Sequence, residues 1–153
     1  MNKFLIFFSI IFSMLLLSAE EEIKILRVID GDTVSAKSRG TEIKIRLSEI
    51  DAPEMDQPYG TNSKKCLYEL IRENSSLRFK SDGQDNYGRS LGWLVTDDKN
   101  LNYEMIKQGC AWVYDRYVIN KTIYSFQNGA RLKNLGLWKQ NNPIAPWIWR
   151  RNN

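Results

Sequence analysis

The sequence contains no histidine among its 153 residues. This absence excludes catalytic triads that depend on imidazole, nucleases that use histidine as a general base, and zinc enzymes with histidine ligands. Two cysteines are too few for a structural zinc site made of cysteine alone. Catalysis by this chain must therefore use carboxylates, Arg, Lys, Tyr, hydroxyls, a thiol or a metal ion held by oxygen.

The first nineteen residues have the layout of a secretory signal peptide. Lys3 gives a positive start, residues 4–17 are almost entirely apolar, and two small residues then precede three glutamates. A membrane-spanning helix needs about 20 apolar residues, so an uncleaved anchor is the weaker alternative. We expect residues 1–19 to be removed, residues 20–153 to form one domain, and the protein to be secreted or periplasmic without a stable membrane anchor.

Acidic and basic residues are distributed unevenly along the chain. Residues 20–60 hold ten acidic and six basic groups, a net charge of −4, whereas residues 61–153 hold eight acidic and fifteen basic groups, a net charge of +7. An acidic cluster inside a basic molecule suits a cation site that must meet a polyanion. Charge alone leaves open the alternative that the surface is patchy by chance.

Five short segments have the pattern of β-strands, and their alternation of apolar and polar residues is strict over 43–47. These segments are residues 23–28, 33–36, 43–47, 77–80 and 91–95. Helical spacing predicts three helices, one beginning near residue 61, one beginning near Leu101, and one that runs through Ile119 and Ile123. Short strands with helices inserted late predict an α+β fold, a five-stranded OB-type β-barrel with about three helices.

Three carboxylates, Asp32, Asp51 and Glu54, lie at turn or strand-end positions around two of these strands. If the two strands pair as a hairpin, both ends return to the same edge, and Asp32 and Asp51 converge. Oxygen ligands favour calcium or magnesium over zinc or copper, and weak calcium sites suffice outside the cytoplasm. An Asp-Gly-Asp turn by itself is more often a plain turn, and the spacing of an EF-hand loop is absent.

Arg46 and Arg89 form a possible clamp for a phosphodiester. Gly88 lets the chain turn, and Arg89 then enters a strand. Planar guanidiniums bind phosphoryl oxygens in pairs, and a carboxylate-bound cation neutralises the charge that develops at phosphorus. Glu54 would then orient or deprotonate a water molecule. The alternative is that both arginines pair with nearby surface acids, which stabilises a protein little.

Seven fragments together resemble the thermonuclease family of staphylococcal-nuclease-like domains. They follow the family's order across most of residues 20–153 and are residues 29–33 (IDGDT), 46–47 (RL), 50–54 (IDAPE), 59–60 (YG), 87–89 (YGR), 108–111 (QGCA) and 135–138 (LGLW). The resemblance implies an OB-type barrel and a calcium-dependent endonuclease that hydrolyses phosphodiester bonds of DNA and RNA. Water would attack in line, the 5′-oxygen would leave, and 3′-phosphates would remain.

The resemblance also assigns a metal site and a water-activating group. Asp32 and Asp51 match the family's calcium carboxylates, and Ala52 matches a position whose backbone carbonyl is a ligand. Glu54 matches the glutamate assigned as general base or water-orienting group. The loop over residues 55–58 is shorter than in the best-known member, so a flexible basic segment that contacts substrate there is missing.

Substrate contacts are implied in the same way. Arg46 and Arg89 match phosphate-binding arginines, and Tyr87 matches a tyrosine near the substrate phosphate. Tyr114 and Tyr117 are candidates for stacking on splayed bases, with Tyr117 the better positional match. We therefore expect DNA and RNA as substrates, single strands preferred, and a monomeric enzyme.

Cys66 and Cys110 are predicted to form a disulfide, because two cysteines in a small domain of an oxidising compartment more often pair than not. Such a bridge would contribute about 4 kcal/mol if unstrained. Two buried, unpaired thiols are the alternative.

Two other functional classes compete with the nuclease. A noncatalytic OB-type module that binds nucleic acid or another polyanion has no need of a carboxylate cluster where a phosphate would dock. A carboxylate-pair glycosidase is weaker, because it does not account for the paired arginines.

Overall fold

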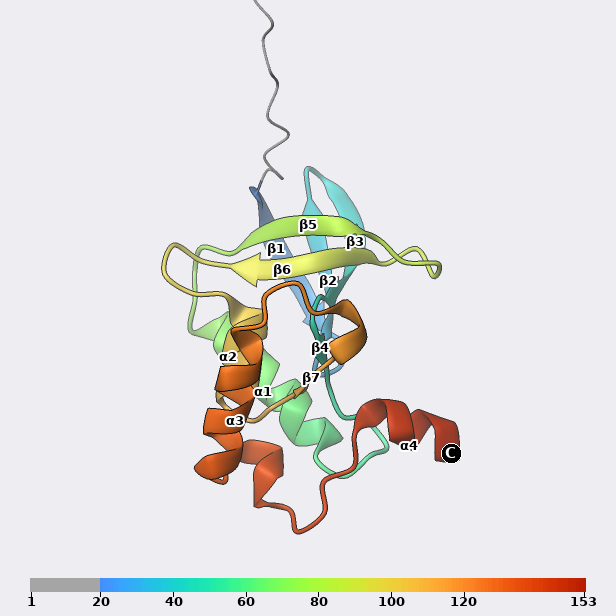
Figure 1. The fold of residues 1–153 in the computed structure, drawn as a ribbon. Coiled ribbons are helices and arrows are strands. Elements are labelled where there is room, and N and C mark those ends of the chain that lie inside the picture. The colour runs from blue at the N-terminus through green and yellow to red at the C-terminus, as the bar shows by residue number, and fades with distance from the viewer. Residues whose placement is uncertain (1–19) are drawn as a thin grey trace, which may run out of the picture.

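Five strands close into a barrel within residues 20–153, the part of the chain that the structure describes (Figure 1). In order around the barrel they are β1 (Glu20–Val28), β2 (Thr33–Ser38), β3 (Thr41–Leu47), β6 (Ser90–Val95) and β5 (Arg78–Gln84). In β3 the side chains of Ile45 and Leu47 are buried and Lys44 is exposed, as a period of two residues requires. Parallel pairing of β3 with β6 and antiparallel pairing of β1 with β5 close the barrel.

Four helices lie at the lower end of the barrel in Figure 1. They are α1 (Gly60–Arg72), α2 (Leu101–Lys107), α3 (Ile123–Leu132) and α4 (Pro146–Asn152), with two 3-10 helices, η1 (Asp115–Tyr117) and η2 (Gly136–Lys139). A separate two-stranded sheet pairs β4 (Ile50–Asp51) with β7 (Trp112–Val113). In this view α2 and α3 lie on the left and α4 on the right.

The expected α+β barrel of five strands is confirmed, with two differences in the helices. The third helix begins at Ile123, and Ile119 precedes it with 67% of its surface exposed. The backbone N–H groups of Ile119 and Asn120 donate to Glu49, which holds this segment in another conformation. The fourth helix, α4, was not expected, although Pro146 in its first turn is favourable there.

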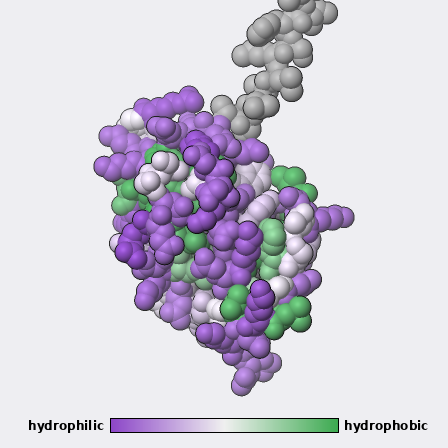
Figure 2. All heavy atoms as spheres, turned by 90° about the vertical axis from the view of Figure 1, so that its left-hand side faces the viewer, coloured by the Kyte–Doolittle hydropathy of each residue, from purple (hydrophilic) through white to green (hydrophobic). Residues whose placement is uncertain are grey.

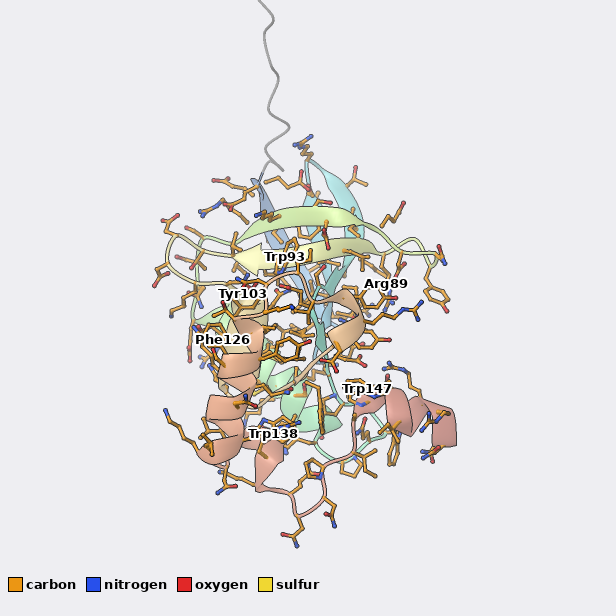
Figure 3. The ribbon with its side chains drawn as sticks, in the orientation of Figure 1. Arg89, Trp93, Tyr103, Phe126, Trp138 and Trp147 are labelled. Atoms are coloured by element: carbon orange, nitrogen blue, oxygen red, sulfur yellow. A yellow bond between two sulfur atoms is a disulfide. The ribbon has the colours of Figure 1, made fainter. Side chains whose placement is uncertain are left out.

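Glu49 is a buried carboxylate that ties several elements together. Only 2% of its surface is exposed, and its backbone adopts a left-handed φ of 67°. One oxygen accepts the N–H groups of Ile119 and Asn120 at 2.7 and 2.8 Å, and the other accepts the Trp93 indole and the Tyr103 phenol at 2.9 Å each. Figure 3 shows Trp93 on β6 just above Tyr103 on α2. Burial of the phenol, and then its hydrogen bond to Glu49, raises the pKa of Tyr103 to about 12.

The surface opposite α4 is mostly polar. Figure 2 shows this face with hydrophilic side chains over most of it and apolar ones in separate areas. No helix within residues 20–153 is long and apolar enough to cross a membrane. The expected signal peptide, residues 1–19, lies outside the described part of the chain.

Candidate active site

A tight loop between β1 and β2 positions Asp32. The Asp30 carboxylate accepts the backbone N–H of Asp32 at 3.0 Å, which closes the turn. Gly31 lies so close to α1 that a β-carbon there would be 2.0 Å from the Ser63 hydroxyl. Only glycine permits this approach, so Gly31 fixes the position of Asp32 immediately before β2. Asp32 has 6% of its surface exposed.

The hairpin of β2 and β3 brings Asp51 back to Asp32. Thr33 pairs with Arg46 in this hairpin, and β4 follows one short turn later. The backbone N–H of Ala52 donates to Asp32 Oδ2 at 2.6 Å, so the two strand ends are joined directly. Asp32 and Asp51 therefore lie at one edge, as the hairpin argument expected.

Arg46 bridges these two carboxylates. Its Nε lies 3.1 Å from Asp32 Oδ1, and its Nη2 donates to Asp51 Oδ1 at 2.9 Å. Its Nη1 donates to the carbonyls of Leu47 and Ile50 at 2.6 and 2.9 Å, and only 12% of the side chain is exposed. Burial raises the pKa of Asp32 to about 7, although the Arg46 guanidinium favours the ionised form.

Glu54 follows on a loop that is held against the start of α1. Its backbone carbonyl accepts the N–H of Gln57 at 2.9 Å, and its N–H donates to the Gln57 side chain at 3.1 Å. A β-carbon at Gly60 would lie 1.9 Å from the Glu54 carbonyl oxygen, so this glycine allows the loop to pack on the helix. The Glu54 side chain stays 38% exposed at the rim of the site.

Arg150 is a residue of this site that the sequence did not reveal. Its Nη1 donates to Glu54 Oε1 at 2.7 Å and lies 3.2 Å from Asp51 Oδ1, while Nη2 donates to Asp51 Oδ2 at 2.8 Å. The hydrogen bonds to Asp51, together with the one to Glu54, hold the pKa of Arg150 above its usual range, although burial of the guanidinium acts in the opposite direction. The only signal in the sequence was the aromatic and basic character of residues 146–151, which points to no particular partner.

Arg89 and Tyr87 lie on a neighbouring groove. The Asp85 carboxylate accepts the backbone N–H groups of Tyr87 and Arg89 and the Arg89 Nε, the last at 2.7 Å, which holds the turn. Tyr87 is 86% exposed, and together with Arg89 and Lys44 it lines a groove of about 340 Å³. Among the described residues Arg89 makes no ion pair with Asp32, Asp51 or Glu54, and Lys44 is a basic residue of this groove that the sequence had not singled out.

The two candidate base-stacking tyrosines are neighbours. Tyr114 and Tyr117 have ring centroids 5.0 Å apart at an interplanar angle of 64°. Trp147 of α4 stacks on Tyr114 at 5.6 Å and 15°, and Figure 3 places Trp147 and Arg89 on the same side of the molecule. One face of Tyr114 is therefore covered by α4.

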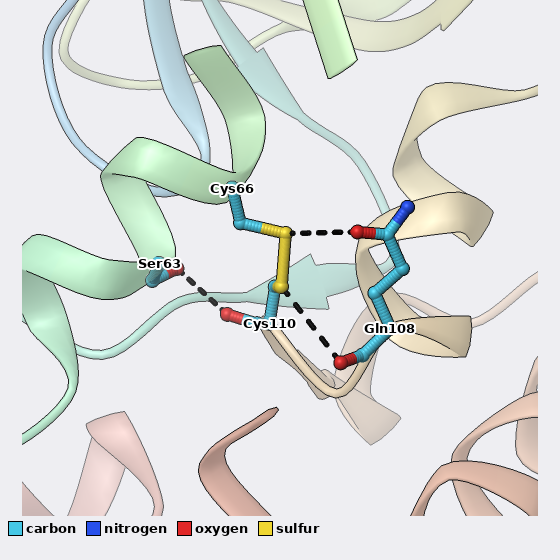
Figure 4. Close-up of a disulfide and its surroundings, with 4 residues drawn as sticks. All are labelled: Ser63, Cys66, Gln108 and Cys110. Carbon is cyan, nitrogen blue, oxygen red and sulfur yellow. Dashed lines mark hydrogen bonds between the residues drawn. A yellow bond between two sulfur atoms is a disulfide. The ribbon is translucent and has the colours of Figure 1, made fainter. Parts of the chain in front are cut away.

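A disulfide joins α1 to the segment that follows α2, close to the loop of Asp32. Cys66 on α1 is bonded to Cys110, which follows α2 (Figure 4). The Ser63 hydroxyl donates to the Cys110 carbonyl at 2.7 Å. Because Ser63 also contacts Gly31, the bridge anchors the same surface of α1 that supports the loop of Asp32.

The oxygen atoms around Arg46 fit a divalent cation by their chemistry. Asp32 and Asp51 supply carboxylates, and Ala52, whose backbone N–H donates to Asp32, has a carbonyl oxygen of the kind that calcium accepts. Within residues 20–153, no three His, Cys, Asp or Glu side chains form a metal-binding group, so water would complete the six to eight ligands. Two guanidiniums bind Asp51, which shows that its oxygens face positions that favour positive charge.

Comparisons with known proteins give a consistent picture. A family model described as staphylococcal nuclease homologue matches residues 44–140. An uncharacterized endonuclease of Haemophilus influenzae is 41% identical over 129 residues, which cover 84% of this chain and 72% of that protein. An uncharacterized endonuclease of Escherichia coli O157:H7 is 36% identical over 98% of both chains, and a micrococcal nuclease of Shigella flexneri is 34% identical over 84% of this chain and 79% of its own.

Proposed function

The chain belongs to the staphylococcal nuclease family, and we propose that this nuclease is a calcium-dependent endonuclease that acts on DNA and RNA, prefers single strands and leaves 3′-phosphates. The observation that carries the proposal is the convergence of Asp32 and Asp51 on the Arg46 guanidinium. A surface built only to bind nucleic acid gains nothing from carboxylates at this position, because they repel phosphate.

Asp32, Asp51 and the Ala52 carbonyl are the groups that would hold the calcium ion. When bound, the ion supplies positive charge to the phosphoryl oxygens. Arg46 uses three of its N–H donors in hydrogen bonds to Leu47, Ile50 and Asp51, and its Nε pairs with Asp32; the second N–H of Nη2 would be the donor to a phosphoryl oxygen. Glu54 is the exposed carboxylate of the set, and its role is to orient a water molecule and accept its proton.

The groove lined by Lys44, Tyr87 and Arg89 supports binding of the substrate. Arg89 and Lys44 carry positive charge on its walls, and the exposed Tyr87 ring offers a face on which a base can stack. Such stacking contributes about 1–3 kcal/mol per base and tolerates any sequence. Splayed bases are available only in single strands, which is the basis for the proposed preference.

The test is digestion of single-stranded DNA and RNA oligonucleotides by the purified protein, with calcium and then with a chelator. We expect chelation to abolish cleavage, and Glu54→Gln and Arg89→Ala each to lower the rate about 10²–10³-fold. Arg72→Gln, which removes an exposed arginine of α1 paired with Glu69, is the matched control and should keep full activity. Oligonucleotide binding without calcium-dependent cleavage would instead identify a noncatalytic OB-type module.

We further propose that the protein is secreted or periplasmic. The support is the signal-like character of residues 1–19 in the sequence. Mass spectrometry of the protein from periplasm and medium should find a chain beginning near Glu20. A chain that retains residues 1–19 in the membrane fraction would contradict this.

A further inference from the structure

Asp51 is buried, and guanidinium groups bind both of its carboxylate oxygens. The residue is 1% exposed, Oδ1 is shared by Arg46 and Arg150, and Oδ2 pairs with Arg150 at 2.8 Å. Glu54 Oε1 is bound by the same Arg150 at 2.7 Å. A cation that uses Asp51 as a ligand must therefore take the place of a guanidinium.

The two arginines differ in how firmly they are held. Arg46 lies on β3, is 12% exposed, and also donates to the carbonyls of Leu47 and Ile50. The side chain of Arg150 is 41% exposed, and it projects from α4, a helix of only seven residues. Arg150 is therefore the guanidinium that a cation can displace at the smaller cost.

The charge of the cluster favours the same exchange. Asp32, Asp51 and Glu54 carry three negative charges when ionised, and Arg46 offsets one of them. Arg150 offsets only one more, whereas a divalent cation in its place offsets both that remain. The cation therefore compensates for the charge that the buried Asp51 loses when the Arg150 guanidinium leaves.

The rest of α4 is attached by few polar contacts. Gln57 donates to the carbonyl of Ile144, just before the helix, at 2.6 Å, and the Trp149 indole lies 3.3 Å from Asp56. Trp147 makes ring contacts only, stacked on Tyr114 and edge-on to Trp112 at 5.8 Å. Displacement of Arg150 thus removes the contacts that bind the helix to the carboxylates. Movement of the helix would also uncover the Tyr114 face that Trp147 occupies.

We propose that α4 is a displaceable cover of the active site, in which Arg150 occupies the Asp51 oxygens that the divalent cation would use and Trp147 occupies the position of a substrate base. This inference rests on the proposed calcium dependence. Cation binding and Arg150 binding are then mutually exclusive, and the cation releases the helix. The cover keeps the carboxylates neutralised until the cation is available.

The test is calorimetric titration of calcium into the chelator-treated full-length protein and its variants, without any nucleic acid. Arg150→Gln should bind calcium about tenfold more tightly, because the competing guanidinium is gone and tenfold corresponds to about 1.4 kcal/mol. Arg151→Gln is the matched control, since it removes the same charge from the adjacent exposed position, which makes no ion pair within residues 20–153. Arg150→Lys, which keeps the charge but not the planar fork, should fall between the two and also serves if Arg150→Gln folds poorly.

A second readout follows the helix itself. The Trp147 contribution to the fluorescence, obtained by subtracting the spectrum of Trp147→Phe, should change on addition of calcium to the otherwise unaltered protein. Three results would overturn the inference and leave the proposed calcium dependence standing. These are an equal calcium affinity in all variants, a lower affinity in Arg150→Gln, and an equal increase in affinity in Arg151→Gln. No calcium binding by any variant would overturn both.

Discussion

Glu49→Gln tests whether the buried carboxylate of Glu49 organises the fold. A glutamine has nearly the same shape, and its amide oxygen can still accept the N–H groups of Ile119 and Asn120. Its NH₂ group then faces the Tyr103 hydroxyl, which can turn to become an acceptor, and the Trp93 indole N–H, which cannot. One buried donor is left unsatisfied, at about 1–3 kcal/mol, and two charge-assisted bonds become weaker, so we expect a total loss of about 3 kcal/mol.

Urea unfolding measures this loss directly through the midpoint and the slope. Glu69→Gln is the matched control, because it removes the same charge from the exposed Glu69–Arg72 pair of α1 and should cost less than about 0.5 kcal/mol. If Glu49→Gln also stays within about 0.5 kcal/mol of the unaltered protein, the four hydrogen bonds do not stabilise the native state and the reasoning is refuted.

Three further changes test other contacts. Replacing Cys66 and Cys110 with serine should cost about 4 kcal/mol in urea unfolding, given the 44-residue separation, and an unchanged midpoint would contradict this. Gly31→Ala should lower the midpoint because the new β-carbon meets a hydroxyl of α1 at 2.0 Å, whereas Gly129→Ala in α3, where nothing lies within 4 Å, should raise stability by up to about 1 kcal/mol. The pKa of Tyr103 is about 12 in the folded protein against an ordinary value of 10, so its contribution to the free energy of unfolding is complete below pH 10 and is lost as pH rises toward 12. Tyr103→Phe should remove this loss from the profile of stability against pH.

The barrel and the carboxylate pair followed from local patterns. Strict alternation marked β3, and the turn at Asp30 and Gly31 marked the start of β2. A hairpin fixes where both of its ends lie, so the approach of Asp32 to Asp51 could be predicted from strand pairing alone.

The contacts that were missed join residues far apart in the chain. Arg150 meets Asp51 and Glu54 across 99 and 96 residues, and Glu49 meets its side-chain and backbone partners across 44 to 71 residues. Each depends on how separate elements pack, and neither residue has a spacing that distinguishes it from an ordinary surface charge. For the same reason, Ile119 has the spacing of a helix face but lies before α3, because its backbone N–H donates to the distant Glu49.

The most direct test of the central claim is the rate of cleavage of an end-labelled single-stranded DNA as a function of free calcium. The account predicts a rate that rises to saturation with calcium, falls to background in chelator, and is largely lost in Asp51→Asn. Cleavage at an equal rate in chelator, or no cleavage at any calcium concentration, would contradict it.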